Sequence, residues 1–74
     1  MLIKVVKNNG KFELYEPPHD VMPGASNKLF EFRTTVLNKM NELNNYDIPN
    51  KIAQFINVVN VNGKDIYYYE VYCG

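Results

Sequence analysis

The chain has 74 residues with eight basic and eight acidic side chains, so its formal net charge is zero. A protein that binds nucleic acid through its phosphates needs an excess of positive charge. The zero net charge therefore argues against a nucleic-acid partner. The single cysteine excludes an internal disulfide and favours a reducing, cytoplasmic compartment, and no apolar run is long enough to cross a membrane. We expect one compact domain, 1–74, near the lower size limit for a chain that folds on its own.

The first predicted element is a β-hairpin, with strands Leu2–Lys7 and Lys11–Glu16 joined at Asn9-Gly10. Asn-Gly between apolar runs indicates a type I′ turn, which requires a positive φ at both central residues. The register that follows from a two-residue turn sets four apolar side chains on the inner face of the hairpin: Ile3, Val5, Phe12 and Leu14.

One helix is predicted over Lys28–Asn44. At about 100° per residue, its apolar side chains fall within one stripe about 160° wide, as expected for a helix that covers a sheet: Leu29, Phe30, Phe32, Val36, Leu37, Met40 and Leu43. Asn44-Asn45 can end the helix in a left-handed cap, and Pro49 prevents its continuation.

A second hairpin is predicted from Ile52–Val61 and Lys64–Cys73, closed by Asn62-Gly63. An unbroken register from this turn sets Phe55 opposite Glu70, and burying an unpaired carboxylate is costly, so we assign that face to the outside. The other face then supplies the core residues Ile52, Ile56, Val58, Tyr67, Tyr69, Val71 and Cys73. A bulge in the first of these strands is the alternative, and it would reverse part of the assignment.

Strand, strand, helix, strand, strand predicts an α+β fold of ββαββ order. A right-handed crossover would set the last strand parallel to the first, which gives a four-stranded mixed sheet of order 2-1-4-3 with the helix packed on one face. The opening segment Met1–Lys11 resembles the first hairpin of ubiquitin, and the overall plan resembles the immunoglobulin-binding domains of bacterial proteins G and L. These resemblances imply membership of the β-grasp superfamily, and no binding residue is carried over from it.

Few side chains suggest catalysis or metal binding. A nucleophilic Cys–His pair would need Cys73 and His19 within hydrogen-bond reach, but the predicted topology sets them at opposite ends of the sheet, on the order of 20 Å apart. His19 with Asp20 and Glu16 offers too few ligands for a metal, and no glycine-rich phosphate loop is present. We therefore expect no enzyme activity, no metal and no cofactor.

The outer face of the sheet carries the strongest functional signal. Apolar patches rich in tyrosine and edged by charges are typical of protein interfaces, and Lys4, Glu13 and Glu70 supply such an edge. The predicted partner-binding residues are Val6, Tyr15, Phe55, Val59, Tyr68, Glu70 and Tyr72. The alternative is cross-strand aromatic pairing that only stabilises the sheet.

These observations favour a small non-enzymatic module that binds another protein, or itself as a homodimer, through the open sheet face. Its size, neutrality and abundant asparagine favour a phage or mobile-element protein, a viral inhibitor of a host factor. The alternative is a ubiquitin-like carrier that reacts through Gly74. A third possibility, stacking of single-stranded nucleic acid on Phe55, Tyr68 and Tyr72, lacks the basic excess it requires.

Overall fold

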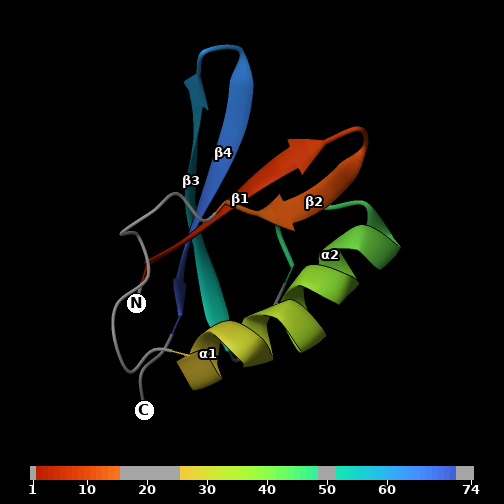
Figure 1. The fold of residues 1–74 in the computed structure, drawn as a ribbon, viewed down its shortest axis with the longest axis vertical. Coiled ribbons are helices and arrows are strands. Elements are labelled where there is room, and N and C mark those ends of the chain that lie inside the picture. The colour runs from red at the N-terminus through yellow and green to blue at the C-terminus, as the bar shows by residue number, and fades with distance from the viewer. Residues whose placement is uncertain (1, 16–25, 49–51, 72–74) are drawn as a thin grey trace.

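The structure is a computed structural model that describes residues 2–15, 26–48 and 52–71. These residues form an α+β fold in which one antiparallel sheet carries a helix against one face (Figure 1). The described strands run in the order β2-β1-β4-β3, as predicted. Their bounds are β1 (Leu2–Asn8), β2 (Lys11–Leu14), β3 (Ala53–Val61) and β4 (Lys64–Val71).

Both predicted hairpin turns are confirmed. Asn9 and Gly10 have φ values of 53° and 77°, and Asn62 and Gly63 have values of 52° and 81°, as a type I′ turn requires. Next to the turns the predicted registers also hold, with Lys7 opposite Phe12 in the first hairpin and an unbroken pairing over 57–61 in the second.

The prediction that the first and last strands are parallel is wrong. Strands β1 and β4 are antiparallel, with Leu2 opposite Glu70 and Val6 opposite Ile66, so the sheet is antiparallel rather than mixed. It therefore also lacks the parallel central pair that the β-grasp resemblance implies. The connection 44–52 is long enough to allow the observed direction. When fully extended, this connection spans about 30 Å, which is about the length of the preceding helix. The chain can therefore return to the end of the sheet at which the helix began.

The helix runs from Ser26 to Leu43 in three consecutive segments: α1 (Ser26–Glu31), the π-helical η1 (Phe32–Leu37) and α2 (Asn38–Leu43). It ends at Asn44, which has a left-handed φ of 54° and confirms the predicted cap. The π-helical segment was not predicted. Side-chain donors serve carbonyl groups along it, since Thr34 Oγ1 donates to Phe30 O at 3.0 Å and Asn38 Nδ2 donates to Thr34 O at 2.8 Å.

The core lies between the helix and the inner face of the sheet. Its buried members come from both hairpins and the helix: Ile3, Val5, Phe12, Phe32, Val36, Met40, Ala53, Tyr67, Tyr69 and Val71. The predicted apolar stripe of the helix is wider than the part that is buried, because Phe30 and Leu43 are 67% and 52% exposed. The π-helical turn advances through a smaller angle per residue, so Phe32, Val36 and Met40, each four residues apart, stay in line toward the sheet.

A β-bulge in β3 changes the faces of the second hairpin. The register shifts between Phe55 and Asn57, so Phe55 lies opposite Tyr69 instead of Glu70. Phe55 therefore packs against the core, whereas Ile56 is 49% exposed. The predictions that Phe55 faces outward and that Ile56 belongs to the core are both wrong, because a bulge places one extra residue in the strand and inverts the alternation beyond it.

The turn end of the β3–β4 hairpin extends beyond the helix and the first hairpin (Figure 1). Val58 points to the inner side there, opposite Tyr67, but is 43% exposed, so its assignment to the core is wrong. The helix does not reach far enough along the hairpin to cover it. Of the other predicted core residues, Tyr67, Tyr69 and Val71 are buried and Ile52 is half-buried against the core, while Cys73 lies outside the described residues.

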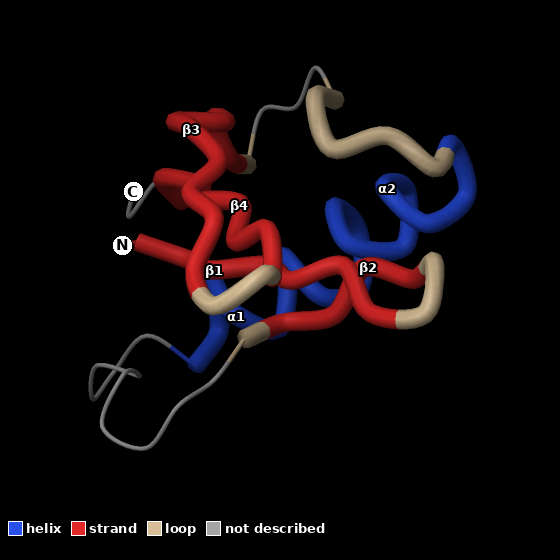
Figure 2. The backbone as a smooth tube through the Cα atoms, turned by 90° about the horizontal axis from the view of Figure 1, so that it is seen from above, coloured by secondary structure: helices blue, strands red, loops and turns tan. Residues whose placement is uncertain are grey.

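Tyr46, in the connection after α2, is 38% exposed and contacts aromatic side chains of β3 and β4. Its ring centroid lies 5.0 Å from that of Phe55 and 5.0 Å from that of Tyr67, and its carbonyl oxygen accepts a hydrogen bond from the Tyr69 hydroxyl. The connection and α2 lie to the same side of β3 and β4 (Figure 2). Burial, and to a lesser degree the neighbouring Tyr67, Asp47 and Tyr46, raise the pKa of the Tyr69 phenol above its ordinary value.

Candidate protein-binding face

The outer face is the face of the sheet that points away from the helix. The strand registers place on it one group of apolar side chains from β1, β3 and β4, which we call the outer-face patch: Leu2, Val6, Ile56, Val59, Ile66 and Tyr68. Ile66 is buried on this face, with Val6 and Val59 as its cross-strand neighbours, so the patch has a packed centre without a covering element from the described residues.

A shallow hollow of about 290 Å³ lies in this patch, lined by Leu2, Ile56, Asn57, Val59 and Tyr68. The β-bulge makes the hollow, because it turns Ile56 outward beside Asn57 instead of into the core. Its lining side chains are apolar or uncharged, and Tyr68 adds a hydroxyl that can pair with a partner while its ring offers apolar area.

The structure brings part of the predicted site together. Val59 and Tyr68 both line the hollow. Val6 lies on the same face of β1, opposite Ile66, and is half-buried. Tyr15 is exposed beyond the end of β2, where its backbone N–H donates to Lys4 O at 2.8 Å.

The remaining predicted residues fall elsewhere or at the margin. Glu70 is exposed opposite Leu2, at the edge of the hollow. Phe55 packs on the inner side of the sheet and so is not available to a partner on the outer face. Tyr72 lies outside the described residues.

Charged side chains flank the patch on β1 and β2. Lys4 lies opposite Tyr68 on β1, and Glu13 lies opposite Val6 on β2. Lys4 and Glu70 have further contacts within the chain. This arrangement of an apolar centre and charged neighbours is the usual anatomy of a non-obligate protein interface.

Sequence reasoning missed Leu2 and Ile56, which both line the hollow. A signal for Ile56 was present in the strand itself. Its polar residues Gln54 and Asn57 are three apart, and a strict alternation of period two cannot keep two such residues on one face. That spacing indicates an extra residue in the strand.

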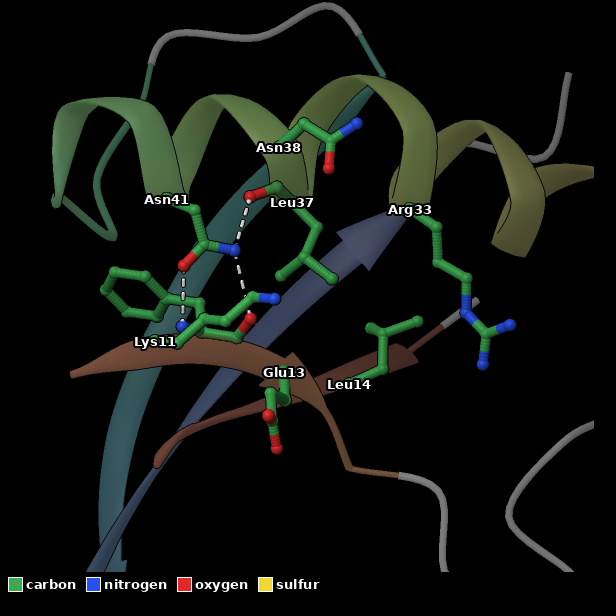
Figure 3. A pocket seen from close by; sticks show the side chains of 8 residues that line it. Lys11, Glu13, Leu14, Arg33, Leu37, Asn38 and Asn41 are labelled. Carbon is green, nitrogen blue, oxygen red and sulfur yellow. Dashed lines mark hydrogen bonds between the residues drawn. The ribbon is translucent and has the colours of Figure 1, made fainter. Parts of the chain in front are cut away.

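A second hollow, of about 330 Å³, lies between the helix and β2 (Figure 3). The Asn41 side-chain amide spans the gap beside it: Phe12 N–H donates to Asn41 Oδ1 at 2.7 Å, and Asn41 Nδ2 donates to Phe12 O at 3.0 Å and to Leu37 O at 3.2 Å. The amide is therefore engaged in holding the helix to the strand. Lys11, Glu13 and Arg33 also line this hollow. The register sets Glu13 opposite Val6, and its carboxylate points to the side of β2 away from the helix (Figure 3).

The residues considered for chemistry, His19, Asp20, Glu16, Cys73 and Gly74, all lie outside the described residues. Within 2–15, 26–48 and 52–71, no group of three or more His, Cys, Asp or Glu side chains could hold a metal ion. No helix in the described part of the chain has the length and apolar character needed to span a membrane.

Comparison of the chain with protein-family models, with curated proteins and with solved structures found no match.

Proposed function

We propose that this protein is a non-enzymatic module that binds another protein through the outer face of its sheet. The observation that carries the proposal is the apolar hollow on that face, lined by Leu2, Ile56, Val59 and Tyr68 and bordered by charged side chains. A monomeric protein that exposes contiguous apolar area of this kind usually uses it for an interaction.

The arrangement favours a protein over a small ligand as the partner. The hollow is shallow and open to solvent, whereas small-molecule sites enclose most of the ligand surface. A protruding aromatic or branched side chain from a partner would fit such a depression, and Tyr68 is of the type that dominates interface energetics. That the partner is a host factor inhibited by a phage protein stays a prediction from composition. So does the alternative of a carrier that reacts through Gly74.

The proposal is tested with single charged substitutions on the two sides of the molecule. Tyr68→Asp and Ile56→Asp place a charge in the hollow, and Phe30→Asp places one on an exposed apolar residue of the helix. We expect a partner isolated with the wild type to bind Phe30→Asp with unchanged affinity and each outer-face variant at least about thirtyfold more weakly, the loss typical of a central interface residue.

Circular dichroism of each variant shows whether it is folded. If a folded Tyr68→Asp protein keeps the wild-type affinity for the partner, the outer face is not the binding surface. If both outer-face variants unfold, those side chains stabilise the sheet, and the alternative of purely structural cross-strand pairing is the correct one.

A further inference from the structure

The two edge strands of the described sheet differ in whether their outward-pointing backbone groups are hydrogen-bonded. At β2, the Asn41 amide accepts from the backbone N–H of Phe12 and donates to its C=O, so it occupies the hydrogen-bonding positions that a neighbouring strand would use (Figure 3). At the opposite edge, no described strand pairs with the outer side of β3.

The backbone groups that remain at the β3 edge follow from the turn. In an antiparallel hairpin, pairs that exchange hydrogen bonds alternate with pairs whose N–H and C=O point away from each other, and the pair next to a two-residue turn is of the first kind. In the first hairpin this makes Phe12 the first outward-pointing residue of β2, which agrees with its bonds to Asn41. In the second hairpin, counting from the pair Val61–Lys64 makes Asn60 and Val58 the outward-pointing residues of β3.

The segment Asn57–Val61 also lacks the features that protect natural edge strands. It contains no charged residue and no proline, and the bulge lies beyond it, toward the start of β3. Valine predominates in it, and its side chains are exposed on both faces of the hairpin. Such an edge is a template for one more strand.

We propose that this edge pairs antiparallel with the same segment of a second copy of the chain. A two-fold axis through Val59, perpendicular to the sheet, sets Val59 opposite its own copy, Val58 opposite Asn60 and Asn57 opposite Val61. In this register each outward-pointing Val58 meets an outward-pointing Asn60, so both symmetry-related pairs exchange their backbone hydrogen bonds.

The self-pairing is favoured by charge and by shape. Because β3 carries no ionised side chain, the axis brings no like charges together. The axis also leaves the outer faces of both copies on the same side, so the two outer-face patches become continuous across the joined sheet. The contact is short, five residues from each copy, and at the low end of interface sizes, so the dimer dissociates on dilution.

The first test is the solution mass by sedimentation equilibrium over a concentration series reaching about 1 mM, the range in which so small an interface assembles. Val58→Pro removes an N–H that points away from β4, so the ladder between β3 and β4 is kept while two hydrogen bonds of the dimer are lost. We expect the wild type and the control Val58→Thr to dimerise alike, and Val58→Pro to dimerise at least about tenfold more weakly. A wild type that stays monomeric throughout overturns the proposal.

The second test fixes the register and does not depend on a proline being tolerated. In a Cys73→Ser background, Val59→Cys has its own copy opposite it and forms an intermolecular disulfide under mild oxidation. Asn57→Cys and Val61→Cys each cross-link poorly alone but cross-link when mixed, because they lie opposite each other. Equal cross-linking by all three single variants, with no gain on mixing, overturns the proposed pairing. Asn57 and Val59 also line the outer-face hollow, so only the first test, at Val58 on the inner side of the hairpin, is separate from the test of the outer face.

Discussion

The two hairpins share the same turn but differ in what surrounds them. The β1–β2 hairpin lies under the helix, its inner side chains are buried, and its edge is closed by Asn41. The β3–β4 hairpin packs against the core only in the half that holds the start of β3 and the end of β4. Between the bulge and the turn it extends past the helix, and its valines are exposed on both faces (Figure 1). The comparison teaches that an Asn-Gly turn determines how two strands pair, whereas the neighbouring helix determines which of their side chains and edges remain accessible.

The largest expected difference lies between a buried position near the first turn and an exposed position near the second. Phe12→Ala should lower the free energy of unfolding by about 3–5 kcal/mol, because it empties a fully buried site. Val61→Ala, in the exposed part of the second hairpin, should change it by no more than about 0.5 kcal/mol. Urea denaturation of dilute protein measures both. Similar losses for the two variants would mean that the end of the second hairpin is covered as well as the first.

The closure of the β2 edge should have a smaller but clear effect. Asn41→Ala leaves Phe12 N–H and C=O without their partner, and we expect a loss of about 1–3 kcal/mol in the free energy of unfolding. Asn38→Ala, one turn earlier on the exposed side of the helix, is the matched control and should cost within about 0.5 kcal/mol.

Asn41→Asp sharpens this comparison. It keeps the acceptor for Phe12 N–H but replaces the donor that serves Phe12 O and Leu37 O, so we expect it to be destabilising as well. An Asn41→Ala protein as stable as the wild type would contradict the assigned role of the amide.

The smallest expected effect concerns alkaline pH and the inner side of the second hairpin. A phenol whose pKa is higher in the folded than in the unfolded state binds more protons when folded, so the free energy of unfolding is constant below about pH 10 and falls as the pH rises further. Tyr69→Phe should reduce this fall above about pH 10 in urea titrations. A fall unaffected by Tyr69→Phe would assign it to another group.

Much of the candidate face follows from local pairing. Tyr68, Val59 and Val6 were placed on the outer face from the turn and the alternation alone, because each lies between a turn and any irregularity of its strand. Phe55 and Ile56 could not be placed in this way, because a bulge shifts the pairing without altering the composition of the strand. The choice between the two registers depends on which one buries Phe55 beside Tyr46 and Tyr69 and leaves Gln54 opposite Glu70.

The sequence by itself determined the elements, both type I′ turns, the left-handed end of the helix at Asn44 and the strand order. The elements, the turns and the cap depend on backbone preferences and on periodicities that act within a few residues, whereas the strand order followed from a rule for crossover connections. Only the tertiary structure decided the direction of β4 against β1, the bulge at Ile56, the π-helical turn and the different fates of the two sheet edges. Each of these depends on contacts between segments far apart in the chain. The connection 44–52 could have led the chain to either end of the sheet, and packing against the core selects between the two.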